Sequence, residues 1–177
     1  MHGIVHKTLK EYVEEDVDAA DWDEIVDRAG LEPKLYLPVS HYPDEEVTAV
    51  FDALTAATGE TEAEVQRAFG RRLAPELLNT FKAHVRDDWA TRELLLALEI
   101  VYERVAAQDE DSELPDVATE ADGGDVVVTY DSERKLCSLA RGIVLGVADH
   151  YGDDVTITES ECARKGADRC RLRVAFA

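Results

Sequence analysis

The residues best suited to binding chemistry lie at alternate positions near the middle of the chain: Tyr130, Ser132 and Arg134. The Arg134 guanidinium can hold a carboxylate through two parallel hydrogen bonds, and the two hydroxyls can donate further ones. We expect Tyr130 to end a strand, Ser132 to cap the following helix and Arg134 to lie in its first turn. The three donors would then converge near a helix N-terminus, which itself favours anions. An ordinary capped helix with a surface arginine would show the same pattern.

Three cysteines, Cys137, Cys162 and Cys170, form a second group in the last quarter of the chain. Their odd number argues against a framework of structural disulfides. Cys162 and Cys170 are spaced evenly about a glycine, so a hairpin would place them nearly opposite each other. Three interpretations stay open: a zinc site with His150, Glu161 or water as fourth ligand, a reversible Cys162–Cys170 disulfide, and buried free thiols.

Acidic residues dominate the composition, because 39 Asp and Glu oppose 19 Lys and Arg and give a formal net charge of −20 at pH 7. A nucleic-acid-binding surface needs the opposite charge, so nucleic acid is not expected as a partner. The carboxylates are spread along the whole chain, and arginines outnumber lysines. Such a coat is typical of proteins that stay soluble in concentrated salt. It indicates a halophilic source and predicts poor stability at low salt.

The chain of 177 residues suits one domain, or one domain of two lobes around a shared cavity. It has no run of about 18 apolar residues, so no membrane span is expected. Its first residues lack the basic end and apolar stretch of a secretory signal. These features predict a cytoplasmic protein.

Apolar spacing predicts helices over 3–13, 22–29, 44–59, 61–69 and 75–81, with a short extended piece or strand at 35–39. Asp44 is an N-cap candidate, and Thr61 with Glu64 has the pattern of a capping box. Gly70 is expected to interrupt one helix and Pro75 to begin the next. The segment that begins at Thr91 and runs to residue 102 is apolar on nearly all sides, which predicts the central buried helix.

The character of the sequence changes after a linker-like stretch at 108–125. β-branched residues predict a strand at 126–130, then a helix from Ser132 through Val147, and strands at 155–158 and 170–174. The predicted fold class is therefore α+β, with a helical N-terminal lobe and a C-terminal lobe that holds a small antiparallel sheet and a packed helix.

An ordered series of short motifs resembles the haem nitric oxide/oxygen binding (H-NOX, HNOB) family nearly from end to end. The motifs are Met1-His2-Gly3, Trp22 to Ala29-Gly30-Leu31, Tyr42-Pro43-Asp44-Glu45-Glu46, Phe69-Gly70-Arg71, Tyr130-x-Ser132-x-Arg134 and Cys162-x3-Gly166-x3-Cys170. The resemblance implies the H-NOX fold over 1–177, with a distal helical lobe at 1–60. It also implies a proximal lobe at 61–177 with the central helix, the sheet and the C-terminal helix.

The same resemblance implies a haem pocket in which Tyr130, Ser132 and Arg134 bind the propionates and Pro115 leans on the macrocycle. Some members of the family carry a cysteine-ligated zinc in the region of the three cysteines. Alignment assigns an apolar distal wall, without a hydrogen-bond donor for dioxygen, to Val5, Leu9, Leu73, Leu139 and Ile143.

The chain departs from the family at the iron ligand. H-NOX domains hold iron through a histidine on the central helix, and the matching residue here is Tyr102. Tyrosinate can ligate haem iron and favours the ferric state. None of the five histidines is an obvious substitute, and each is expected to be a surface or structural residue. Three outcomes stay open: haem bound through Tyr102 or another ligand, a different tetrapyrrole or apolar ligand in the same cavity, and a filled pocket.

The function implied is a haem- or tetrapyrrole-binding sensory module for nitric oxide or haem that signals to a separate protein, such as a kinase or chemotaxis protein. The alternative is a haem-free module that binds another apolar ligand or acts as an interaction scaffold. Enzymatic peroxide chemistry is not expected, because the apolar distal wall offers no acid–base residue.

Overall fold

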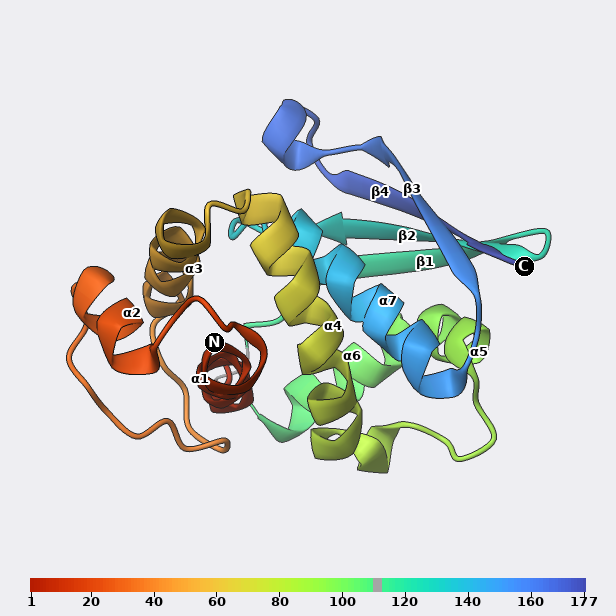
Figure 1. Cartoon of the computed structure of the whole chain (residues 1–177). Helices are drawn as coiled ribbons and strands as arrows, with labels where there is room; N and C mark the ends of the chain where they lie inside the picture. The colour runs from red at the N-terminus through yellow and green to blue at the C-terminus, as the bar shows by residue number, and fades with distance from the viewer. Residues whose placement is uncertain (110–112) are drawn as a thin grey trace.

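A central pair of helices, α4 and α7, separates the N-terminal helices from a four-stranded antiparallel sheet (Figure 1). The structure, a computed structural model, describes residues 1–109 and 113–177. Its helices are α1 (Gly3–Asp16), α2 (Trp22–Arg28), α3 (Asp44–Thr58), α4 (Glu62–Thr80), α5 (Thr91–Leu96), α6 (Leu98–Gln108) and α7 (Cys137–Tyr151), with short 3-10 turns η1 (Lys82–His84) and η2 (Ala163–Lys165). Its strands are β1 (Asp116–Asp122), β2 (Asp125–Asp131), β3 (Val155–Glu161) and β4 (Cys170–Phe176). The predicted α+β class is confirmed.

The N-terminal helices share a hydrophobic core with α4 and the beginning of α7. The capping box predicted at Thr61 and Glu64 is present and starts α4. Asp44, in contrast, is the first residue of α3 and not its N-cap, which is Pro43. Residues 35–39, predicted as an extended piece or a strand, form no strand. This loop leaves Leu35 and Val39 exposed, and an isolated bridge between His2 and His41 follows it.

Helix α4 continues through Gly70 and Pro75, so the predicted interruption is wrong. Gly70 is needed for packing rather than for breaking the helix. A Cβ at Gly70 would meet the backbone of Gly142 in α7, and a Cβ at Gly142 or Gly146 would meet the backbone of α4 in return. The two helices therefore touch backbone to backbone, which only glycine allows. Tertiary packing outweighs the unfavourable helix propensity of glycine and proline here.

The apolar segment from residue 91 is divided at Ala97 into α5 and α6, and it is not the central buried helix that was predicted. Within α6 only Val101 and Val105 are fully buried, and Ile100 is 50% exposed. The fully apolar pattern was misleading because α6 covers one side of the molecule instead of crossing its middle. The long helices at the centre are α4 and α7.

The sheet has the strand order β1-β2-β4-β3, with every neighbouring pair antiparallel. Its buried residues pack on α5 and α7 in a second core. Strand β1 lies in the stretch that was predicted to be a linker, of which residues 110–112 fall outside the described residues. It is an edge strand, mostly exposed and rich in acidic residues, so its sequence lacks the apolar alternation that signals a strand.

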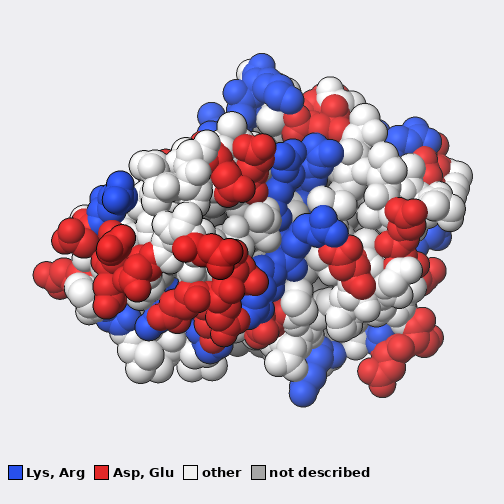
Figure 2. Space-filling model, in the orientation of Figure 1, with Lys and Arg blue, Asp and Glu red and all other residues white. Residues whose placement is uncertain are grey.

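Charged side chains cover much of the surface (Figure 2). On the face shown, acidic groups gather over the N-terminal helices, and basic groups form a band between them and the sheet side. Arg71 and Arg72 of α4 form ion pairs with Asp149 of α7 and with Glu15 of α1, respectively. None of the described helices is long and apolar enough to span a membrane.

Candidate functional site

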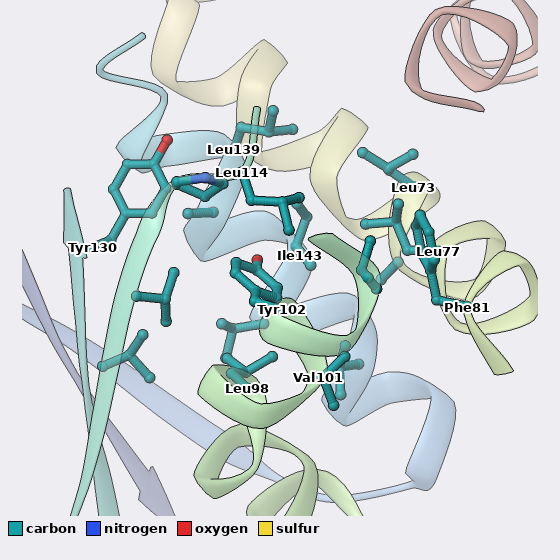
Figure 3. Close-up of a pocket in the computed structure, with 18 of the residues that line it drawn as sticks. Leu73, Leu77, Phe81, Leu98, Val101, Tyr102, Leu114, Tyr130, Leu139 and Ile143 are labelled. Carbon is teal, nitrogen blue, oxygen red and sulfur yellow. The ribbon is translucent and has the colours of Figure 1, made fainter. Parts of the chain in front are cut away.

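A mostly apolar pocket of about 270 Å³ lies between the start of α1, α4, α6, α7 and strand β2 (Figure 3). This volume lies near the lower end of the range for small-molecule sites, which are typically apolar with a few polar groups. The polar and charged side chains among the described lining residues are those of His2, Tyr102, Glu113, Tyr130 and Arg134. The pocket is therefore an apolar cavity with a small number of polar side chains that could bind a ligand.

Pro115 and four of the five residues assigned to the distal wall do line this pocket. Those present are Val5, Leu73, Pro115, Leu139 and Ile143. Leu9 is the exception, because it lies in the N-terminal core, where it is 1% exposed, and not along the pocket. Its side chain is part of the hydrophobic core that the N-terminal helices share with α4.

Tyr102 projects from α6 with its hydroxyl directed into the pocket among apolar side chains (Figure 3). Burial, with a smaller contribution from Tyr130, raises the pKa of Tyr102 to about 12. Its hydroxyl has no hydrogen-bond partner among the described residues. Tyr102 is half-buried, and its hydroxyl faces the pocket space, where a ligand could meet it.

Only two of the three predicted anion-binding residues reach the pocket. Tyr130 is buried near the end of β2 and lines it, as does Arg134. Ser132 lies in the turn after β2, where its Oγ accepts the backbone N–H of Arg134 at 3.3 Å. Burial raises the pKa of Tyr130, and the neighbouring Ser132 hydroxyl and Arg134 guanidinium oppose that rise.

The predicted helical position of Ser132 and Arg134 is wrong, because α7 begins later, at Cys137. Residues 132–135 form a turn in which the N–H of Lys135 bonds to the Ser132 carbonyl at 3.0 Å, and Lys135 has a positive φ of 51°. This left-handed residue prevents the helix from starting at Ser132. Arg134 therefore approaches the pocket from a turn and not from a helix N-terminus.

The Arg134 guanidinium already binds carboxylates of the chain itself. Its Nε donates to Asp44, and its Nη1 donates to the Glu113 carbonyl at 2.7 Å, while Nη2 lies 3.2 Å from the Glu113 carboxylate. The Asp44 carboxylate also forms an ion pair with the amino group of Met1, 2.6 Å away. Burial alone would raise the pKa of Asp44, but hydrogen bonds from that amino group and from Arg134 lower it. Sequence reasoning missed Asp44 and Glu113 as partners, since no local pattern reports contacts so far apart.

The three cysteines come together on the sheet side of α7, beside Tyr130. Cys137 is paired with Cys170 in a disulfide, and Cys162 is a buried free thiol. The predicted pairing of Cys162 with Cys170 is therefore wrong. Cys162 does lie close, because one ligand atom from each of the three cysteines falls within 4.8 Å of the others. His150 lies at the opposite end of α7 from Cys137, so it cannot complete a metal site there.

Fold and site together define an α+β domain with a small-molecule pocket, which joins apolar walls, two tyrosines and a carboxylate-binding arginine. The sequence profile of the haem-NO-binding family, HNOB, matches residues 2–159. The chain belongs to this family, which confirms the predicted family and haem as the cofactor that the family binds.

Solved H-NOX structures share this fold. An H-NOX protein from S. oneidensis in the Fe(II)NO state is 21% identical, with a TM-score of 0.91 over 100% of this chain and 99% of that one. A mutant of the T. Tengcongensis H-NOX is 20% identical, with a TM-score of 0.83 over 99% of this chain and 97% of that one. No curated protein matches the sequence.

Proposed function

We propose that this chain is a sensory module that binds haem or a related tetrapyrrole and signals to a separate protein, such as a kinase or chemotaxis protein. Membership of the haem-NO-binding family supports the cofactor class. The observation that carries the proposal is the Tyr102 hydroxyl, which is directed among apolar side chains into a preformed pocket. When bound, haem would supply an iron centre at which a diatomic gas can bind.

The residues present fit this cofactor, although they differ from the family's usual iron ligand. Apolar walls suit the faces of a macrocycle, and Tyr102 offers an oxygen ligand in place of the histidine. Arg134 is arranged to bind carboxylates, as Asp44 and Glu113 show, so it would hold the propionates together with Tyr130. Because Tyr102 would bind the iron as an anionic phenolate, this pocket would favour ferric over ferrous iron.

The test is a titration of the purified protein with haemin in concentrated salt, followed by absorption spectroscopy. We expect a sharp Soret band for the wild type and its loss or marked shift in Tyr102→Phe. Tyr12→Phe is the matched control, because Tyr12 is a buried tyrosine of the N-terminal core that does not line the pocket. A wild-type protein without a Soret band at saturating haemin would refute haem binding. It would then favour the second candidate, a module for another apolar ligand.

We also propose that the reduced cysteines bind zinc. Their sulfur atoms lie close enough for three thiolates to share one tetrahedral ion, with Glu161 or water as the fourth ligand. After reduction, each chain is expected to take one zinc ion from a chromophoric chelator. Cys162→Ser should abolish that zinc binding. Equal zinc uptake by the variant would exclude this site. The oxidised protein, in which Cys137 and Cys170 are bonded to each other, should take up none.

A further inference from the structure

His2 is a pocket residue that has no role in the function proposed so far. It immediately precedes α1, and its imidazole packs edge-on against Phe81, another lining residue, with ring centroids 5.5 Å apart. The described lining residues on α1, α4 and α7 otherwise carry apolar side chains: Val5, Leu73, Ala74, Leu77, Leu78, Leu139, Ala140, Ile143, Val144 and Val147. The remaining histidines, His6, His41, His84 and His150, do not line the pocket. His2 is thus the one polar side chain among the described residues on this part of the wall.

The first turn of α1 determines which nitrogen of His2 carries the hydrogen. The backbone N–H of Ile4 donates to His2 Nδ1 at 3.3 Å, so that Nδ1 acts as the N-cap acceptor. A nitrogen that accepts cannot also hold a proton, so the neutral ring carries its hydrogen on Nε2. Burial, reinforced by the neighbouring His41, lowers the pKa of His2 and keeps the ring neutral at pH 7. No acceptor for this Nε2–H is found among the described residues.

We infer that His2 donates its Nε2–H to a small ligand held in the pocket and so determines which ligands the sensor prefers. The inference rests on the proposed function and refines the expectation of a distal wall without donors. The ligands favoured are small molecules or anions with a terminal oxygen or nitrogen acceptor, such as cyanide, over apolar molecules of the same size. A neutral donor forms a stronger hydrogen bond with an anionic acceptor than with a neutral acceptor.

His2→Asn separates this role from helix capping. Asparagine is among the best N-cap residues, so the variant keeps the cap of α1 while its shorter side chain withdraws the donor from the pocket. His2→Ala loses both the cap and the donor. Thermal unfolding of the three proteins shows which variants keep their stability, and we expect His2→Asn to match the wild type.

The experiment measures cyanide binding to the haemin-loaded proteins by absorption and by the infrared C–N stretch. We expect His2→Asn to bind cyanide at least about tenfold more weakly, the size of one hydrogen bond to an anion, and to shift the C–N stretch. If His2→Asn still binds haemin but has the cyanide affinity and the C–N stretch of the wild type, the role of His2 is overturned and the proposed function is not. A wild type that binds no haemin would overturn the proposed function and this inference together.

Discussion

Asp44 and Arg134 are 90 positions apart in the sequence, and the Asp44 carboxylate accepts the Nε–H of Arg134 at the polar end of the pocket. The ion pair joins the first turn of α3 to the turn that precedes α7. Any ligand carboxylate that binds Arg134 must therefore compete with a carboxylate of the protein. The affinity of the pocket for haem then depends on Asp44 as well as on Arg134.

Removing the competing charge should strengthen haem retention. In Asp44→Asn the Arg134 guanidinium loses one of its two competing carboxylates and keeps Glu113, so haemin should leave several-fold more slowly, whereas Arg134→Ala should release it faster. The measurement is the rate of haemin transfer to an excess of a scavenging globin. If Asp44→Asn accelerated release as Arg134→Ala does, Asp44 would be a residue that positions Arg134 and not a competitor.

Asp44 should also make the stability of the protein depend on acid pH. Its pKa is lower in the folded chain than in the unfolded one, so it contributes stability above the ordinary aspartate pKa. That contribution is lost as the pH falls through the folded value. Urea unfolding between pH 5 and 2 should show a smaller loss in Asp44→Asn than in the wild type. Parallel curves for the two proteins would contradict the ion pair.

Tyr102 should release a proton when haemin binds at neutral pH. Its pKa of about 12 means that the free protein holds the phenol protonated, and ligation to iron requires the phenolate. Haemin binding in weakly buffered solution should therefore release about one more proton from the wild type than from Tyr102→Phe. In the free protein, the raised pKa lowers stability as the pH rises from about 10 to about 12, and Tyr102→Phe should reduce that loss.

The contact between α4 and α7 should tolerate no side chain at Gly142. A Cβ there would meet the backbone of Arg67, so Gly142→Ala must push the helices apart and should cost at least about 1–3 kcal/mol of unfolding free energy. Gly124→Ala is the matched control, because nothing lies within 4 Å of its Cβ position. Chemical denaturation of both variants gives the comparison. Equal stability of the two would show that the helices separate without cost.

Salt should stabilise the protein strongly. With a formal net charge of −20, self-repulsion among carboxylates opposes folding until salt screens it. The melting temperature should rise when the KCl concentration is raised from 0.1 to 2 M. A sucrose series of equal osmolarity separates the screening of charges from the general exclusion of solute from the protein surface. A melting temperature that is the same at both salt concentrations would argue against halophilic adaptation.

Sequence reasoning succeeded where a short pattern determines structure locally. It predicted the capping box at Thr61, strand β2 and the family, because these depend on neighbouring residues or on ordered motifs. It failed at Gly70, where a residue that weakens isolated helices serves a contact with a distant helix. The proposed boundary between two lobes at residue 60 stays a prediction.

The candidate site shows the same division. Tyr102, Tyr130 and Arg134 were found from the motifs, and all three line one pocket. The partners of Arg134, the pairing of Cys137 with Cys170 and the position of His2 depend on contacts between distant segments. A single sequence carries no signal for these contacts. The turn at Lys135 could not be foreseen either, since lysine is rarely left-handed.

The glycine-lined crossing of α4 and α7 also limits how the cavity can change its width. Helices in backbone contact cannot approach further, and they slide only by carrying their glycines out of register. The part of the pocket wall that α4 and α7 form is therefore rigid (Figure 3). It includes Leu73 and Leu77 of α4 and Leu139 and Ile143 of α7. Adjustment to occupants of different sizes would therefore come from the other elements that line the pocket, among them α6.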